Sequence, residues 1–286
     1  LKIGETATVS LEFSEAVNDF SKDDITVVNG SLSEMTSTDN ITWTGTFTPT
    51  SDIEDTSNVL TLATSYTDTA GNAGPSATTS NYQIDTKSPT VVSFTISDSA
   101  LKIGETATVS LEFSEAVNGF DSDVDITVEN GSLTKMTSTD NITWTGTFTP
   151  TSDIEDTSNV LTLATSYTDT AGNAGPSATT SNYQIDTKSP TVVSFTISDS
   201  ALKIGETATV SLEFSEAVND FSKDDITVVN GSLSEMTSTD NITWTGTFTP
   251  TSDIEDTSNV LTLATSYTDT AGNAGPSATT SNYQID

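Results

Sequence analysis

The feature that most constrains this sequence is a unit of about one hundred residues that occurs three times. The segment Leu1-Lys2-Ile3-Gly4-Glu5-Thr6 recurs at Leu101 and at Leu202, and residues 202–286 are identical to residues 1–85. The middle copy is one residue longer, because residues 118–125 replace the shorter segment 18–24. Solenoid repeats span roughly 20–50 residues, so a period this long favours a domain with its own core. We therefore predict three domains: domain 1 (residues 1–85), domain 2 (86–186) and domain 3 (187–286).

Alternating apolar and polar side chains predict strands throughout each unit, and no stretch has the spacing of a helix. In residues 41–48, for example, Ile, Trp, Gly and Phe share one face while Thr residues occupy the other. Seven strands are predicted in domain 2: Thr90–Ser97, Glu105–Ser114, Asp125–Glu129, Ser132–Met136, Ile142–Thr149, Asn159–Thr168 and Ala178–Asp186. Seven short strands in about 100 residues are typical of an immunoglobulin-like or fibronectin-III-like sandwich. The expected fold is all-β, with tandem seven-stranded sandwiches in an extended rod.

Local signals add three expectations about these strands. Val92, Phe94 and Ile96 should be buried in the first strand of domain 2. Asn130-Gly131 should form a two-residue hairpin turn, because both turn positions favour a positive φ. Domain 1 has no counterpart of the strand Thr90–Ser97. Either the sequence is cut from a longer array, or an edge of domain 1 is left open for a strand from a neighbour.

The composition excludes several classes of function. The chain has no Cys and no His, so disulfides, Cys/His zinc sites and Ser-His-Asp triads are impossible. Eight Lys+Arg against 41 Asp+Glu give a formal net charge of −33. Such a surface repels phosphate backbones and anionic lipid, which argues against nucleic-acid partners and against a membrane-surface role. No apolar run is long enough for a membrane-spanning helix, so membrane insertion is not expected.

Three motifs in fixed order resemble a known family. They are the run at residues 104–117 (GETATVSLEFSEAV), the loop at 167–175 (YTDTAGNAG) and the boundary at 185–192 (IDTKSPTV). Together they resemble the bacterial Ig-like extender repeats of giant RTX adhesins, which include the ice-binding adhesin of a marine bacterium. The resemblance implies a calcium-bound, secreted spacer on the bacterial cell surface that holds a ligand-binding module away from the cell. It does not imply that the repeats themselves bind the ligand.

The sandwich topology places acidic loops of neighbouring domains against each other at the joints. Two carboxylate-rich ends repel unless a cation lies between them, and Ca²⁺ accepts six to eight oxygen ligands with tolerant geometry. We therefore predict Ca²⁺ at each joint. The expected ligands are Asp85, Glu115, Asp169 and Asn173 at the first joint, and Asp186, Glu216, Asp269 and Asn273 at the second. Further candidates in the acidic loops at the lower ends of domains 1 and 2 are Asp52, Asp55, Asp153 and Asp156. Solvated turn residues are the alternative interpretation.

A separate acidic run occurs in domain 2 alone. Asp121, Asp123 and Asp125 alternate as in the first half of an EF-hand loop, although no glycine or distal glutamate completes that motif. An additional calcium site there competes with the interpretation of an acidic surface loop.

Two further interpretations concern function. Thr42, Thr44, Thr46, Thr48 and Thr50 share one strand face, which could bind ice or carbohydrate or could be an uncharged outer face of a strand. Enzymatic activity is not expected, because every candidate acidic pair is repeated in similar copies and a compact unit implies no cleft. The predicted function is that of a monomeric, calcium-rigidified extender whose partners are the neighbouring repeats of the same adhesin.

Overall fold

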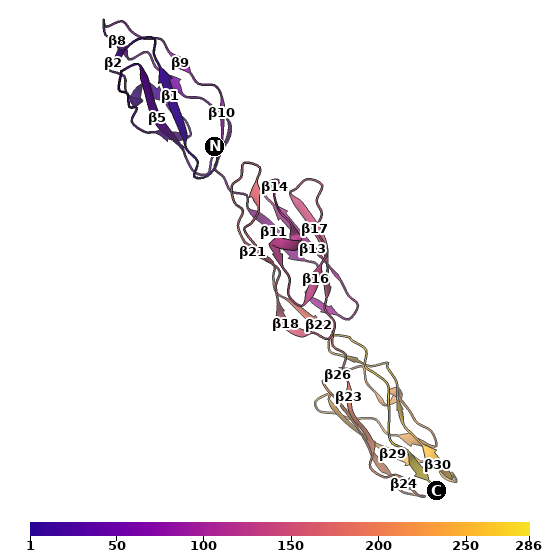
Figure 1. Cartoon of the computed structure of the whole chain (residues 1–286). Coiled ribbons are helices and arrows are strands. Elements are labelled where there is room, and N and C mark those ends of the chain that lie inside the picture. The colour runs from indigo at the N-terminus through magenta and orange to yellow at the C-terminus, as the bar shows by residue number, and fades with distance from the viewer.

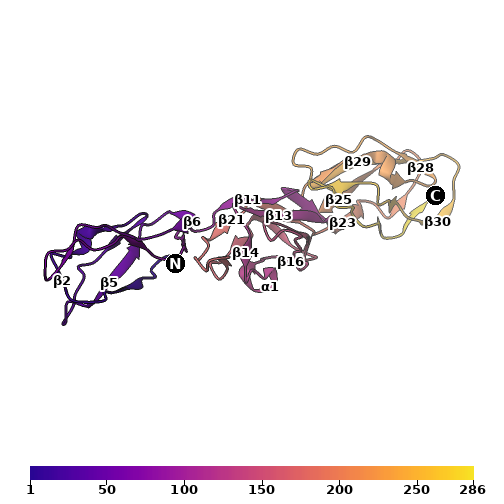
Figure 2. The same ribbon diagram turned by 90° about the horizontal axis from the view of Figure 1, so that it is seen from above.

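Three β-sandwiches follow one another end to end in an elongated rod, as a computed structural model of residues 1–286 shows (Figure 1). The view turned by 90° shows the same extended arrangement (Figure 2). Each predicted domain range encloses one hydrophobic core. The prediction of an all-β chain of tandem Ig-like domains in a rod is confirmed.

Domain 2 contains strands on both sides of its core and one short helix. Its elements are β11 (Val91–Ile96), β12 (Ala100–Lys102), β13 (Ala107–Phe113), β14 (Val117–Asn118), α1 (Ser122–Asp125), β15 (Ile126–Thr127), β16 (Gly131–Leu133), β17 (Thr143–Pro150), β18 (Glu155–Asn159), β19 (Thr162–Leu163), β20 (Thr168–Asp169), β21 (Ala178–Thr179) and β22 (Tyr183–Asp186). One face is the sheet β11-β13-β17-β16, and the ladders β12-β22-β18 and β15-β19-β21 form the other, with β14-β20 at the upper end.

Domains 1 and 3 repeat this plan. Domain 1 has β1 (Ala7–Glu12), β2 (Val17–Asn18), the 3-10 helix η1 (Lys22–Asp24), β3 (Ile25–Thr26), β4 (Gly30–Leu32), β5 (Thr42–Pro49), β6 (Glu54–Asn58), β7 (Thr61–Leu62), β8 (Thr67–Asp68), β9 (Ala77–Thr78) and β10 (Tyr82–Asp85). Domain 3 has β23 (Val192–Ile197), β24 (Ala201–Leu202), β25 (Ala208–Phe214), β26 (Val218–Asn219), the 3-10 helix η2 (Lys223–Asp225), β27 (Ile226–Thr227), β28 (Gly231–Leu233), β29 (Thr243–Pro250), β30 (Asp256–Asn259), β31 (Thr262–Leu263), β32 (Thr268–Asp269), β33 (Ala278–Thr279) and β34 (Tyr283–Ile285).

The core of domain 2 forms where the inner faces of the two layers meet. Val109, Leu111 and Phe113 project from β13, and Phe148 projects from β17 to meet Tyr183 edge-on at a centroid distance of 5.4 Å. Each of these side chains is at most 1 % exposed. Since no disulfide supports the fold, this apolar burial is the main source of its stability.

The first strand of domain 2 differs from the prediction at Val92. Val91 pairs with Phe113, but Ser93 pairs with Glu112, so the strand contains a β-bulge between them. The extra residue shifts the alternation, which turns Val92 outward at 59 % exposure while Phe94 stays in the core. The expectation that Val92 is buried was therefore wrong.

The Asn130-Gly131 pair is not a hairpin turn. β15 pairs with β19, whereas β16 pairs with β17, so the chain crosses between the two layers at this point. Asn130 has a positive φ of 54°, but Gly131 does not. A Cβ atom at Gly131 would collide with the Phe148 ring, so glycine is required there by close packing.

Two of the long predicted strands are interrupted. The segment Asn159–Thr168 divides among β18, β19 and β20, and Ala178–Asp186 divides into β21 and β22. The acidic segment before Asn159 is itself strand β18, which pairs with β22 through a register shift. In domain 1, the sheet β1-β5-β4 contains no strand at the position that β11 holds in domain 2.

Candidate metal centres at the domain joints

Each joint brings together three carboxylates from two domains. At the first joint, Asp85 ends β10 of domain 1, while Glu115 follows β13 and Asp169 ends β20 of domain 2. One oxygen from each side chain lies within 4.8 Å of the others. Asp186, Glu216 and Asp269 form the same arrangement at the second joint. Six of the eight residues expected at the joints therefore form two compact clusters.

These carboxylates are withdrawn from water. Asp169 and Asp269 are fully buried at 0 % exposure, and the other four are half-buried. Burial raises the pKa of Asp85 and of Glu115, and the negative charge of Asp169 raises both further. The pKa values of Asp186 and Glu216 are raised in the same way, first by burial and then by Asp269. The site thus holds negative charge at a cost in free energy.

The remaining predicted ligands, Asn173 and Asn273, bridge the two domains. The Asn173 side-chain amide donates to the backbone oxygen of Asp85 at 2.9 Å and to Asp169 Oδ2 at 2.7 Å. Its Oδ1 accepts a 2.8 Å hydrogen bond from the backbone amide of Ile3. Asn273 makes the equivalent bonds to Asp186, Asp269 and Ile103. Asn173 and Asn273 therefore join the two domains at each joint through hydrogen bonds to both.

No lysine forms an ion pair with the cluster carboxylates, although the charges of Lys87 and Lys188 partly offset the rise in pKa of the half-buried carboxyls. The Lys87 ammonium lies 3.9 Å from Glu54, and Lys188 lies 3.6 Å from Glu155, but no lysine nitrogen lies within 4 Å of a cluster carboxylate. Lys2 reaches across the first joint to the backbone oxygen of Gly172 at 3.4 Å. The negative charge of each cluster therefore has no protein counter-ion at ion-pair distance.

The donor set of each cluster fits Ca²⁺. All three side chains are carboxylates, which are the hard oxygen ligands that Ca²⁺ prefers. Asp85, Glu115 and Asp169 would hold the ion at the first joint, and Asp186, Glu216 and Asp269 at the second.

The upper end of domain 1 shows the same loop without a partner domain. There Asp68 Oδ1 accepts the Asn72 backbone amide at 2.8 Å and Oδ2 accepts the Asn72 side-chain amide at 2.7 Å. Asn72 is exposed, whereas its counterpart Asn173 is 2 % exposed. The loop conformation is therefore intrinsic to the domain, and docking against the next domain is what buries it.

Four predicted ligands lie outside the clusters. Asp52 and Asp153 are exposed and adopt a positive φ of 58° in turns. Asp55 Oδ2 accepts the side-chain amide of Asn29 at 2.8 Å, and Asp156 does the same with Asn130 at 2.9 Å. Asp55 and Asp156 thus hold the asparagine at the point where the chain crosses from one layer to the other, and they are not part of the carboxylate clusters.

The acidic run of domain 2 caps a helix. Asp121 is the N-cap of α1, accepts the Asp123 backbone amide and pairs with Lys135 at 2.9 Å. Asp125 accepts the Asp121 backbone amide at 2.7 Å and also the hydroxyl of Ser166. The three carboxylates do not converge on one point, because Asp121 and Asp123 both face the Lys135 ammonium, at 2.9 and 3.8 Å, while Asp125 binds the start of the helix. The expected cluster of Asp121, Asp123 and Asp125 is therefore not formed.

Sequence reasoning missed the cross-joint contacts of the segment Lys2-Ile3. The only sequence feature that could have indicated these contacts is that the same residues precede Gly4 and its counterparts in each repeat. A Cβ atom at Gly172 would lie 3.0 Å from the Lys2 ammonium nitrogen, whereas one at Gly71, in the loop without a partner, would meet nothing within 4 Å. Gly172 and Lys2 therefore belong to the joint.

The threonines of β5 lie on the outer face of domain 1, as expected. Thr42, Thr44, Thr46 and Thr48 of this strand and Thr50 just after it are exposed, and three of them lie opposite residues with hydroxyls on adjacent strands. Thr46 pairs with Thr8, Thr44 with Ser10, and Thr48 with Ser31. The hydroxyl surface therefore extends over three strands rather than one.

Comparisons with known proteins give one family. The sequence profile of a family described as "Bacterial Ig-like domain" matches residues 1–84, 85–185 and 186–285. A search of the curated proteins found no match.

The solved structures that match this chain are distant in sequence. An I-band fragment of titin is 10 % identical with a TM-score of 0.49, covering 100 % of this chain and 94 % of its own. An E-to-A variant of the same three titin domains gives the same values. The first two Ig domains of DIP-gamma are 11 % identical with a TM-score of 0.34, covering 69 % of this chain and 97 % of their own.

Proposed function

This chain belongs to the bacterial Ig-like domain family, and from that premise we propose that it is an extender segment of a bacterial surface adhesin, rigidified by Ca²⁺ at its joints. Tandem repeats of this kind suit a spacer, because length grows with the number of copies while the contacts at each joint are repeated. The fold is typically structural rather than catalytic. In this role the chain holds a distal ligand-binding module away from the cell.

The observation that carries the proposal is the convergence of three carboxylates at each joint. At separations of up to 4.8 Å, each pair of full charges repels by roughly 3 kcal/mol at an effective dielectric constant of 20. A bound Ca²⁺ neutralises this repulsion and links carboxylates from two domains. Asp85 belongs to domain 1, while Glu115 and Asp169 belong to domain 2. A Ca²⁺ ion bound by all three side chains therefore fixes the orientation of one domain relative to the next.

The setting of the proposed function is extracellular. Bacterial Ig-like domains are often found outside the cell, and the structure contains no helix with the length and apolar character needed to cross a membrane. We place the chain at the cell surface, with neighbouring repeats as its partners and nucleic acid excluded by its net charge of −33.

Calorimetric titration of the whole chain with Ca²⁺ tests the proposal. The wild-type chain should bind one ion at each joint. Asp169→Asn should abolish binding at the first joint, and Asp269→Asn at the second, because each removes the fully buried carboxylate of its cluster. Asp68→Asn is the matched control, since it makes the same change in the same loop at an end without a partner domain. Unchanged stoichiometry and affinity in both joint variants would contradict the assignment.

A second candidate function is direct ligand binding by the hydroxyl face. It is favoured by the rows of Thr and Ser across β1, β5 and β4, which recur in domain 2 as Thr108 opposite Thr147 and Ser110 opposite Thr145. Such rows could face ice or the hydroxyls of a carbohydrate. Thermal hysteresis or a glycan-array signal from the whole chain, lost on Thr44→Lys, Thr145→Lys and Thr245→Lys together, would support this candidate, and its absence would reject it.

A further inference from the structure

Asparagine followed by glycine occurs at four places in the chain, and the structure puts one of these pairs in a different environment from the other three. The pairs are Asn29-Gly30, Asn118-Gly119, Asn130-Gly131 and Asn230-Gly231. In such a pair the backbone nitrogen of glycine can attack the side-chain carbonyl carbon of asparagine, because glycine has no Cβ atom to obstruct the approach. Whether the attack occurs in a folded chain depends on how firmly the two residues are held.

Three of the pairs are locked in place. The Asn130 side-chain amide donates to Asp156 Oδ2 and to Asn159 Oδ1, both at 2.9 Å. A Cβ atom at Gly131 would lie 2.3 Å from the Phe148 ring, so the backbone there has no room to turn. The equivalent pairs of domains 1 and 3 make the same two hydrogen bonds and pack equally close on a phenylalanine ring.

The pair Asn118-Gly119 is free of such contacts. Both residues are exposed, and Asn118 is the last residue of β14. No hydrogen bond within the chain holds the Asn118 side chain or the Gly119 backbone amide. Gly119 has a φ of 74°, and a Cβ atom placed on it would meet nothing within 4 Å. The attacking nitrogen and the carbonyl carbon that it attacks therefore both have room to move.

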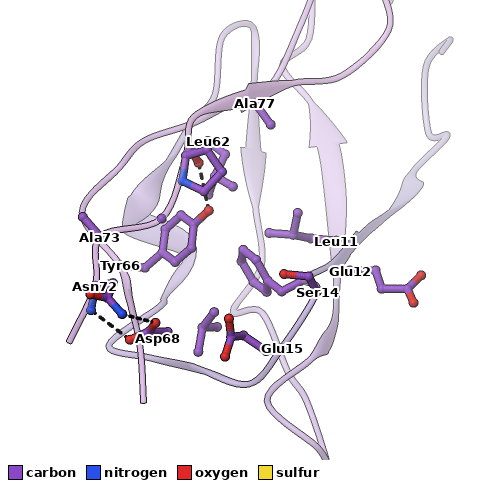
Figure 3. Close-up of a pocket in the computed structure, with 14 residues that line it drawn as sticks. Leu11, Glu12, Ser14, Glu15, Leu62, Tyr66, Asp68, Asn72, Ala73 and Ala77 are labelled. Carbon is purple, nitrogen blue, oxygen red and sulfur yellow. Dashed lines mark hydrogen bonds between the residues drawn. The ribbon is translucent and has the colours of Figure 1, made fainter. Parts of the chain in front are cut away.

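Exposure alone does not free an asparagine in this chain. Asn72 is exposed, yet its side-chain amide donates to Asp68 Oδ2 at 2.7 Å, as Figure 3 shows. Asn18 and Asn219, the counterparts of Asn118 in domains 1 and 3, donate to backbone oxygens at 3.4 and 3.5 Å. Asn118 lacks even this long hydrogen bond.

The turn after β14 does not require glycine. Asp19 and Asp220 hold the position of Gly119 in domains 1 and 3, where they adopt φ values of 58° and 60°. The same turn therefore forms with aspartate, whose side chain obstructs attack by the backbone nitrogen. The reactive pair at this position occurs in the middle repeat alone.

We propose that Asn118 is a site of spontaneous deamidation, a covalent modification that needs only water. The Gly119 nitrogen loses its proton and bonds to Asn118 Cγ, while the bond from Cγ to the side-chain nitrogen breaks and ammonia leaves. Water then opens the resulting succinimide ring. Attack at one carbonyl gives aspartate, and attack at the other gives isoaspartate, in which the main chain runs through the former side chain.

The modification falls beside the first joint. Figure 1 shows β14 at the end of domain 2 that faces domain 1. Val117, immediately before Asn118, pairs with Asp169, the buried carboxylate of the cluster. Phe120 packs edge-on against Trp144 at 4.9 Å. Both products add a negative charge at this end of domain 2, and isoaspartate also lengthens the main chain ahead of Phe120 by one carbon atom. The inference does not depend on calcium or on the spacer role.

Storage of the whole chain in mildly alkaline buffer made with heavy-oxygen water tests the proposal, with peptide mass spectrometry as the measurement. Each deamidation replaces nitrogen by labelled oxygen, so the fragment masses identify the converted asparagine. Because the other pairs must break two hydrogen bonds before they react, we expect Asn118 to convert about 10–100-fold faster than Asn29, Asn130 and Asn230.

Two controls separate the effect of the fold from that of the sequence. In urea, all four pairs should convert at similar rates, because the contacts that protect three of them are gone. Gly119→Asp reproduces the dipeptide of domains 1 and 3, so this variant should fold. Conversion of Asn118 in the variant should become about tenfold slower, because the new side chain obstructs the attack.

Equal rates for Asn118 and Asn130 in the folded chain would overturn the proposal. A preference for Asn118 that persists in urea, or an unchanged rate in Gly119→Asp, would overturn it as well. So would an Asn118 that stays intact in the folded chain long after the same residue has been converted in urea, because the fold would then protect this pair too.

Discussion

The backbone amide of Ile3 donates a 2.8 Å hydrogen bond to the side-chain oxygen of Asn173, 170 residues further along the chain. Ile103 and Asn273 make the same bond at the same sequence separation and the same distance. The two joints are therefore copies of one docking geometry. This bond crosses between domains beside the carboxylate cluster, so it orients one domain on the next as well as joining them.

Removal of the bridging amide should weaken docking specifically. We expect Asn173→Ala to lower the free energy of unfolding in chelator by about 1–3 kcal/mol, because buried Asp169 and the part-buried backbone groups of Asp85 and Ile3 each lose a partner. Chemical denaturation followed by Trp fluorescence provides the measurement. Asn72→Ala makes the same change in an exposed loop and should cost less. Equal losses in the two variants would show that the cross-joint bonds contribute nothing.

Gly172 offers a steric test of the joint. Gly172 and Gly71 have similar positive φ values of 94° and 89°, so alanine strains both loops by about 1 kcal/mol. Only at Gly172 does the added Cβ meet a residue of the neighbouring domain, namely Lys2. Gly172→Ala should therefore increase the hydrogen exchange of the Ile3 amide, whereas Gly71→Ala should leave it unchanged. An Ile3 amide that stays equally protected in both variants would contradict the predicted contact.

The pH dependence of stability should have opposite signs with and without Ca²⁺. In chelator, the pKa values of Asp85 and Glu115 are raised in the folded state, so above about pH 4.5 these groups bind more protons in the folded chain than in the unfolded chain. Carboxyls whose pKa is lowered, such as Asp39 and Asp140, act with the opposite sign only at lower pH. Stability therefore falls as pH rises from about 4.5 through the raised values, and acidification from pH 7 should increase the Tm. With Ca²⁺ bound, protons compete with the ion, so the same acidification should decrease the Tm.

A double variant tests whether the joint carboxylates, rather than other surface charges, cause this pH dependence of the Tm. Glu115→Gln with Glu216→Gln removes one titrating carboxylate from each cluster, so the rise of Tm on acidification in chelator should become smaller. Melting curves at several pH values, recorded by circular dichroism, provide the measurement. A Tm that falls on acidification in chelator would contradict the sign derived from the pKa shifts.

Each domain should respond to core mutation independently. Phe148 is fully buried and packs on Tyr183, so Phe148→Ala should destabilise domain 2 by about 3–5 kcal/mol. Val92→Ala, at an exposed position of the same domain, should change stability by less than about 0.5 kcal/mol. Calorimetric scans should show one of the unfolding transitions shifted. A common shift of all transitions would instead indicate a single cooperative unit.

The fold was predictable because its signals are local and repeated. Strict alternation in β17 placed Phe148 inward and the threonines outward, as the structure shows. The convergence of Asp85, Glu115 and Asp169 followed from sandwich topology, since alternate loops gather at one end of a domain. These predictions needed only the period of the pattern and the order of the strands.

The errors occurred where a single tertiary contact decides the local structure. A bulge next to the Val91–Phe113 pair turns the Val92 side chain outward, and the alternation of apolar and polar residues does not show where such an extra residue is inserted. Asn130 is held by Asp156, a residue distant in sequence, so the Asn-Gly pair crosses between layers rather than turning back. Asp121 and Asp125 cap a helix of only four residues. A helix this short does not produce the periodic spacing of apolar residues by which helices are predicted.

Small-angle X-ray scattering of the whole chain, with Ca²⁺ and with chelator, tests the central claim most directly. With strands of up to eight residues at roughly 3.3 Å each and loops at both ends, three domains end to end make a rod on the order of 100 Å. With Ca²⁺ we expect the profile of a rigid rod of that length. In chelator, repulsion between Asp85, Glu115 and Asp169 should loosen the joints and give the profile of a flexible ensemble. Identical profiles in the two conditions would contradict calcium-dependent rigidity.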